Sequence, residues 1–192
     1  MKWVVAGYYG FGNLGDELLL HALQTAFAGR PETWEVLSAD PDQTRTTHGT
    51  GAAPRWSPGA VAGGLRGAAG LLFAGGGLLQ DLSGPWTPAY YAALAGAAGV
   101  LGKPVIWLAQ GFGPLRRSWN LRLVRTLLTR AAAVVSRDED GLAWCRRLGV
   151  ASDRLRLGAD LAWLLGPPIM RPDPDGGWGV CLRADWLAGR VP

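Results

Sequence analysis

The chain has 192 residues, 48% of them hydrophobic and 18% charged, which is the composition of an ordinary folded domain and excludes a disordered chain. Its formal net charge of +4 is scattered and forms no basic stripe, so nucleic acid is not indicated as a partner. Cys145 and Cys181 lie far apart, with no C-x-x-C pair and no histidine-rich set, which predicts reduced core residues in a cytoplasmic protein and no metal site.

Short apolar runs alternate with helical segments along the chain. We predict strands at 3–7, 34–38, 71–74, 104–108, 132–136 and 155–157, and helices at 15–28, 87–101, 119–130 and 139–148. Continuous apolar strands separated by helices are typical of a parallel sheet covered on both faces. The sequence therefore predicts an α/β, Rossmann-like domain over residues 1–165 that binds ligands at the carboxyl ends of its strands.

Two other stretches of the chain bear on its organisation. Residues 82–102 carry no charge and are long enough to span a membrane, but their prolines, alanines and glycines favour a buried helix. Residues 166–177 are rich in Pro, Gly and Asp and predict a linker. Residues 178–192 open with an apolar run, which we interpret as the start of a truncated second domain. Its unpaired strand should favour self-association.

A glycine-rich loop follows the first predicted strand, the usual place for an α/β protein to bind an anion. Gly10, Gly12 and Gly15 satisfy the pattern G-x-G-x-x-G, and Asp40 follows the next apolar run. This spacing is that of a dinucleotide site, in which the acid would bind the ribose.

Two carboxylates argue against that interpretation. Asp16 and Glu17 lie in the predicted first turn of the helix, where they would repel the diphosphate of a nucleotide. Either they merely cap the helix, or one of them does chemistry.

Glycines and polar residues also follow the later strands. They include Gly75 to Gly77 with Gln80 and Asp81, then Gln110 to Pro114, Ser136 to Asp138, and Gly158 to Asp160. Each turn alone is better explained as structural, but together they suggest one cleft. Arg137 either pairs with Asp138 or binds an anion in that cleft, and both alternatives stay open.

These segments carry a family resemblance. In order and spacing, Gly7 to Glu17, Gly75 to Asp81, Gly102 to Val105 with Ala109 to Pro114, Ser136 to Asp138, and Gly158 to Asp160 resemble the motif series of polysaccharide pyruvyl transferases. The resemblance implies one half of a two-domain fold like the GT-B glycosyltransferases. It implies phosphoenolpyruvate as the donor substrate, no other cofactor, and a cyclic pyruvate ketal on a cell-surface polysaccharide sugar as the product.

The resemblance also implies partners and a location. The acceptor would be a saccharide, carried by a lipid at the inner membrane face, and the enzyme would be cytoplasmic or peripheral to the membrane. Most of the family's second domain, with a histidine that the family uses for its donor, has no counterpart in the 192 residues. We therefore expect this chain alone to have little activity.

Residue roles follow from the donor's chemistry. We expect Asp16 to be the general acid/base, and Arg137 to bind the carboxylate or phosphate of phosphoenolpyruvate. We expect the substrates to be bound by strand-end residues, namely Gly10, Gly12, Asn13, Gly15, Gly76, Gly77, Gln80, Asp81 and Gln110. The alternatives are an inactive Rossmann-like module that binds a nucleotide or a partner, and a GT-B sugar-nucleotide glycosyltransferase.

Overall fold

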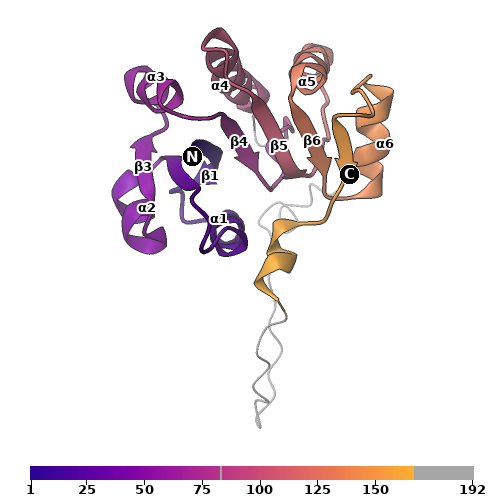
Figure 1. Cartoon of the computed structure of the whole chain (residues 1–192). Coiled ribbons are helices and arrows are strands. Elements are labelled where there is room, and N and C mark those ends of the chain that lie inside the picture. The colour runs from indigo at the N-terminus through magenta and orange to yellow at the C-terminus, as the bar shows by residue number, and fades with distance from the viewer. Residues whose placement is uncertain (83, 167–192) are drawn as a thin grey trace, which may run out of the picture.

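A computed structural model describes residues 1–82 and 84–166 and places them around one parallel sheet (Figure 1). Its strands are β1 (Lys2–Tyr9), β2 (Thr33–Ser38), β3 (Gly51–Pro54), β4 (Leu71–Ala74), β5 (Val105–Gln110), β6 (Ala133–Ser136) and β7 (Leu155–Leu157). They lie in the order β3-β2-β1-β4-β5-β6-β7, and all the pairings are parallel. The α/β, Rossmann-like fold is confirmed.

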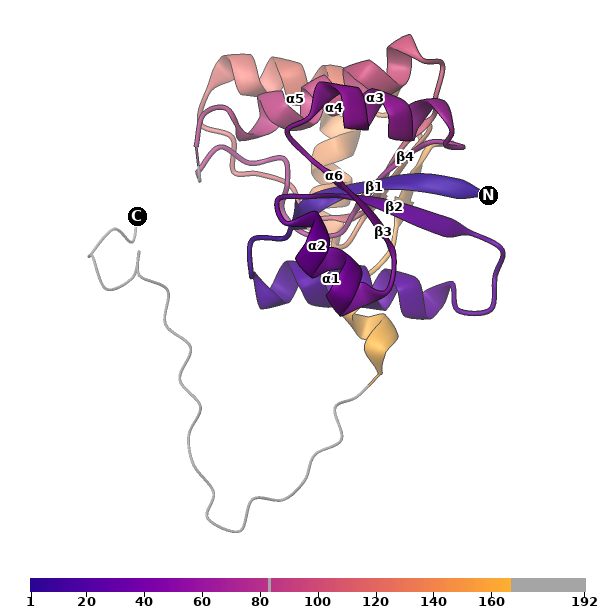
Figure 2. The same cartoon turned by 90° about the vertical axis from the view of Figure 1, so that its left-hand side faces the viewer.

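Helices cover both faces of the sheet. They are α1 (Leu14–Ala26), α2 (Pro41–His48), α3 (Pro58–Arg66), α4 (Thr87–Val100), α5 (Ser118–Arg130), α6 (Glu139–Arg147) and the 3-10 helix η1 (Leu161–Leu165). Figure 2 shows α3, α4 and α5 on one side of the sheet and α1 and α2 on the other. The chain therefore changes face after β3, and the strand order reverses between β1 and β4. Such a switch point leaves a crevice at the carboxyl ends of the two strands.

The central strands form the core because they are apolar on both faces. All four residues of β4 are buried, and Val4 and Val5 of β1 are inaccessible to solvent. Phe73 on β4 is in register with Trp107 on β5, and their rings stack with centroids 3.8 Å apart. This packing fixes the strands whose ends build the crevice.

The predicted elements are confirmed within the described residues, and the structure adds three between residues 39 and 70. Helix α2 is polar throughout, and β3 has the sequence Gly-Ala-Ala-Pro. Helix α3 contains three glycines. None of the three has the continuous apolar run or the clear helical period on which the sequence prediction relied. Apart from Gly166, the linker at 166–177 lies outside the described residues, as do the second domain at 178–192, Cys181 and the predicted self-association.

The long uncharged stretch of the sequence forms α4. Tyr91, Leu94 and Ala98 of this helix are buried against the sheet, as the interpretation of a packed helix requires. Over the described residues, no helix has both the length and the apolar character needed to cross a membrane.

Candidate active site

A cleft of about 290 Å³ opens where β1 and β4 end, at the switch point of the sheet. Its walls come from the loop after β1, the loop after β4 and the first half of α4. The lining residues are Tyr8, Asn13, Asp16, Gly77, Leu78, Gln80, Thr87 and Tyr91. Four of the predicted site residues, Asn13, Asp16, Gly77 and Gln80, therefore meet in one cavity.

The loop after β1 takes a shape that needs glycine. Gly10 and Gly12 have φ of 75° and 72°, in the left-handed region. A Cβ on Gly10 would overlap the Ser38 hydroxyl, so the loop can approach β2 only without a side chain there. Asn13 then caps α1 by accepting a hydrogen bond from the Gly15 amide at 3.0 Å. The cap is thus Asn13, and Asp16 remains available to the cleft.

Asp16 is half-buried and faces the glycines of the opposite loop. Its Oδ1 atom lies over Gly76, where an added Cβ would be 3.3 Å away. Desolvation, and secondarily the charge of Glu17, raises the pKa of Asp16 to about 6. Within the described part of the chain, its carboxylate has no hydrogen-bond or ion-pair partner. A carboxyl group in this state can both accept and donate a proton near neutral pH.

Glu17, the next residue, is fully used within the protein. Its Oε1 accepts a hydrogen bond from the Gly10 amide at 2.9 Å, and its Oε2 lies 2.8 Å from Nε2 of His48. The His48 side chain is almost completely buried. Glu17 therefore fixes the glycine loop through Gly10, and His48 holds Glu17 in place. The sequence did not reveal this role of His48.

The opposite wall is built by the loop after β4 and by α4. Gln80 lines the cleft and accepts a hydrogen bond from the Leu82 amide at 2.6 Å. Thr87 and Tyr91 reach the cleft from the first turns of α4, and burial raises the pKa of Tyr91 to about 12, so that its hydroxyl stays protonated. At the mouth, the Tyr8 ring stacks on that of Phe11 at 4.1 Å.

Tyr8, Thr87 and Tyr91 were not among the predicted site residues. A tyrosine or a threonine in an apolar helix is normally interpreted as a core residue. That Thr87 and Tyr91 line the cleft becomes visible only when α4 is placed opposite the glycine loop. Arg55 was missed as well. It is buried, donates from Nη1 to the Gly7 carbonyl at 2.9 Å, and lies 5.0 Å from the Phe11 ring, so it supports the loop from behind.

Asp81 does not face the cleft, which corrects the expectation that it binds substrate. Its carboxylate is completely buried and accepts hydrogen bonds from the amides of Arg116 and Arg117 and from Nδ2 of Asn120, at 2.9, 3.1 and 3.0 Å. These bonds, with the Arg116 amide as the strongest cause, lower the pKa of Asp81 below its usual range. Asp81 joins the loop after β4 to the start of α5.

Gln110 is also internal, contrary to the expectation that it contacts substrate. Its side chain is inaccessible, and Nε2 donates to the carbonyls of Gly75 and Leu108 at 2.9 and 3.1 Å. Gln110 thus holds β5 to the end of β4 and shapes the glycine turn indirectly. Asp40 likewise has a local task, because its Oδ1 caps α2 through the Gln43 amide at 2.9 Å.

Arg137 lies at the end of β6 and is not part of the cleft lining. Its Nη1 is 3.1 Å from Oδ2 of Asp160, and its Nε is 3.6 Å from Oδ2 of Asp138. The guanidinium packs against Gly111, where a side chain would collide with it. Of the two alternatives, pairing with acids is what the structure shows, and anion binding stays a prediction.

The described residues contain no group of three or more His, Cys, Asp or Glu side chains gathered as a metal site requires. The cleft instead offers one titratable carboxyl, a tyrosine hydroxyl, amide side chains and glycine backbone. Fold and site together define an α/β protein with a polar cleft at the switch point of a doubly covered parallel sheet. The family model for polysaccharide pyruvyl transferase matches residues 13–190, and the chain belongs to that family.

Solved structures agree in fold. The domain is similar to HepE from Anabaena, solved in complex with UDP, with a TM-score of 0.60, 14% identity, and coverage of 83% of this chain and 44% of that one. It is also similar to UDP-N-acetylglucosamine 2-epimerase from Rickettsia bellii, with a TM-score of 0.52, 8% identity, and coverage of 84% and 45%. The chain thus spans less than half the length of these proteins. No curated protein sequence matches it.

Proposed function

We propose that the protein transfers a pyruvyl group from phosphoenolpyruvate to two hydroxyls of a saccharide, forming a cyclic ketal. The observation that carries the proposal is Asp16, an unpartnered carboxyl group in the switch-point cleft of a chain that belongs to the pyruvyl transferase family. The pKa of Asp16, raised to about 6, lets it serve as both base and acid.

The reaction balances in two stages. The oxygen of the first acceptor hydroxyl bonds to C2 of phosphoenolpyruvate, while its methylene carbon gains a proton and becomes a methyl group. The bond between C2 and the phosphate oxygen then breaks, and phosphate leaves with the electron pair. The second hydroxyl bonds to C2 and loses its proton. Of the two hydroxyl protons, one is now on the methyl carbon and the other on the phosphate.

Asp16 supplies the proton transfers of the first stage. Ionised, it accepts the proton of the incoming hydroxyl, and protonated, it delivers a proton to the methylene carbon. The neighbouring side chains suit a polyhydroxy acceptor, because Asn13, Gln80 and Tyr91 offer donors and acceptors around the same cavity. The acidic first turn of α1 disfavours a phosphate at this helix end.

Arg137 is proposed as a ligand for an anionic group of the donor. The ion pairs with Asp138 and Asp160 use Nε and Nη1, while a guanidinium carries five donors in all. The two acids would then orient the guanidinium for a carboxylate or a phosphate. Removing Asp160 should weaken donor binding if it orients Arg137, and strengthen it if it competes with the donor.

A sugar-nucleotide transferase is the competing function, since HepE was solved with UDP and shares the fold. The protein, in the full length that its gene encodes, should be tested by thermal shift with phosphoenolpyruvate, UDP and NAD, since a ligand of the native state raises Tm. Phosphate release and the mass of an amino-sugar acceptor should then be followed with phosphoenolpyruvate.

The outcomes separate the candidates. Stabilisation by phosphoenolpyruvate together with gain of one pyruvyl group by the acceptor supports the proposal. Stabilisation by UDP alone assigns the cleft to a nucleotide-sugar enzyme, and stabilisation by NAD alone assigns it to a dehydrogenase. Stabilisation by none, with no change in acceptor mass, indicates a binding module and contradicts the proposed reaction.

A further inference from the structure

Acidic side chains are absent from three neighbouring helices of the domain, α3, α4 and α5. Between Asp42 and Asp138, a span that includes α3, α4 and α5, the sequence contains a single carboxylate side chain, Asp81, which is buried. Cations continue throughout the same span. Helices α3 and α5 therefore carry arginines, and none of α3, α4 and α5 has a carboxylate side chain, whereas α6 on the same face carries Glu139 and Asp140.

Helix α4 presents an uncharged outer line. Its buried residues Tyr91, Leu94 and Ala98 define the inner side, so that helical periodicity places Gly96 and Val100 outward. Val100 is 88% exposed, and the whole 14-residue helix contains no charge. A surface helix normally has a charged outer side.

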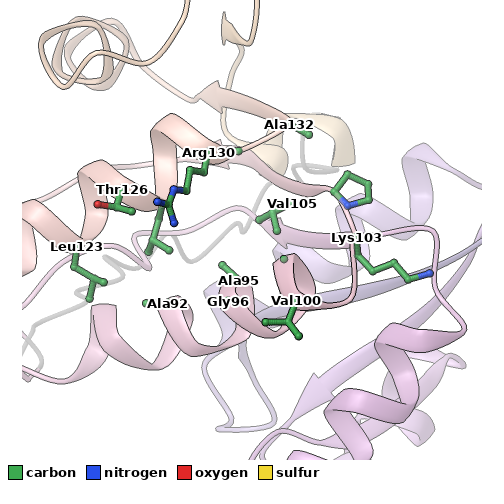
Figure 3. A pocket seen from close by; sticks show the side chains of 14 residues that line it. Ala92, Ala95, Gly96, Val100, Lys103, Val105, Leu123, Thr126, Arg130 and Ala132 are labelled. Carbon is green, nitrogen blue, oxygen red and sulfur yellow. The ribbon is translucent and has the colours of Figure 1, made fainter.

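Helix α5 supplies arginines next to this line. Figure 3 shows Arg130 of α5 reaching over a groove of about 700 Å³ whose other bank is α4, with Gly96 and Val100. Arg122 lies on the same outer side of α5, two turns before Arg130. Among the described residues, neither arginine has an ion-pair partner.

Two tryptophans stand at the beginning of these helices. Trp86 precedes α4 and is 74% exposed, Trp119 begins α5 and is 40% exposed, and their ring centroids are 5.6 Å apart. Thr87, the neighbour of Trp86, lines the cleft that holds Asp16. The pair therefore stands at the rim of the candidate active site.

We infer that the surface formed by Trp86, Gly96, Val100, Trp119, Arg122 and Arg130 docks onto a membrane that contains anionic lipid. Tryptophan rings prefer the headgroup region, uncharged residues tolerate the acyl boundary, and arginines with no neighbouring acid are attracted to anionic headgroups. Nucleic acid fits less well, because the outer line of α4 offers no side-chain donor to a phosphate.

Docking in this way would bring the cleft to the lipid surface. A saccharide carried on a lipid anchor could then enter beside Thr87 without leaving the membrane. This consequence for the acceptor rests on the proposed function, but membrane binding itself does not, and the two are measured separately.

The test is sedimentation of the full-length protein with vesicles of phosphatidylcholine, with and without phosphatidylglycerol. We expect binding only to the anionic vesicles, weakened by salt. The pair Arg122→Gln and Arg130→Gln should weaken binding about fivefold per arginine. The matched control is Arg146→Gln with Arg147→Gln, which removes the same charge from exposed positions in the last turn of α6, the helix that also carries Glu139 and Asp140, and should leave binding unchanged.

Each alternative has its own result. If both double variants lose vesicle binding equally, binding depends only on net charge and the proposal is overturned. The absence of vesicle binding by the wild type would also overturn it. Binding to random RNA that is lost only in the α5 variant would assign the surface to nucleic acid. A dimer in light scattering that Trp86→Ala with Trp119→Ala dissociates, without vesicle binding, would assign it to a second copy. Vesicle binding by a protein without pyruvyl transfer would leave this proposal standing and contradict the proposed function.

Discussion

The two glycine-rich loops beside the switch point both lead to an aspartate, and the two aspartates have opposite surroundings. Asp16, after β1, has no partner within the described residues and its pKa is raised to about 6. Asp81, after β4, accepts three hydrogen bonds and its pKa is lowered. Within the described residues, the same sequence signal therefore yields one carboxyl group without a hydrogen-bond partner and one that is held by three hydrogen bonds.

The difference arises from what the rest of the chain brings to each loop. The amides that hold Asp81 belong to Arg116 and Arg117, about 35 residues later, where the chain enters α5. No such hydrogen bond reaches Asp16 among the described residues, and the Gly10 amide of the same loop donates to Glu17 instead. An acid in a glycine loop is free for catalysis only when no other segment supplies its donors.

The largest expected effect comes from Asp16→Asn. Without a titratable group, the variant should lose about 10²- to 10⁴-fold in kcat, the range typical of general acid/base catalysis. The assay is phosphate release by the full-length protein with donor and acceptor. Asp140→Asn, which alters a carboxylate in the first turn of α6 away from the cleft, is the matched control and should keep its rate. If both variants keep their rates, Asp16 only supports the helix end.

Asp81→Asn should lower stability and leave chemistry intact. The side-chain amide of the variant places an NH₂ donor where the buried N–H groups of Arg116, Arg117 and Asn120 need an acceptor. We therefore expect Tm, measured by differential scanning calorimetry, to fall by roughly 5 to 10 °C. Asp42→Asn, at an exposed surface pair with Arg45, should change Tm little. A fall in kcat at temperatures where the variant is fully folded would return Asp81 to the active site.

The two carboxyl groups should also give stability slopes of opposite sign with pH. Because folding raises the pKa of Asp16 from 3.8 to about 6, its contribution falls as the pH rises through that interval. Asp16→Asn should thus match the wild type near pH 4 and be more stable at pH 7 by roughly 1 kcal/mol, discounted for partial exposure. Asp81 contributes above its ordinary pKa and loses that contribution in acid. Urea titrations across pH test both slopes, and parallel curves for the wild type and Asp16→Asn would contradict the first.

The smallest effect is expected at the brace of the glycine loop. His48→Leu removes the partner of Glu17 Oε2 and should cost about 1 kcal/mol, the usual worth of one hydrogen bond. His48→Gln keeps an N–H donor and serves as the control in the same urea titration. Equal stability of the Leu variant and the wild type would show that Glu17 holds Gly10 without help.

The sheet and most of its helices could be predicted because their apolar runs are intrinsic to the sequence. The strand at Leu71–Ala74 is buried on both faces, and its four consecutive apolar residues already predict this from the sequence. Helices α2 and α3 and strand β3 could not be predicted in this way. Their sequences are polar or rich in glycine, and these segments adopt regular structure only when they pack against neighbouring elements.

The site was predictable as far as local sequence determines it. Asn13 and Asp16 follow from one glycine loop and a helix start. Tyr91 could not be assigned to the site, because its position depends on how α4 packs beside that loop. Gln110 was expected to contact substrate, but its side-chain amide donates to carbonyls at the strand ends. Arg137 depends on Asp160, 23 residues away, as well as on its neighbour.

The 3-10 helix after β7 links the two ends of the described chain mechanically. Leu161 packs beside Leu19 of α1, and both approach Gly75, where an added Cβ would meet their methyl groups. Because close-packed side chains transmit displacement, we expect a displacement of η1 to act directly on α1, the helix that carries Asp16.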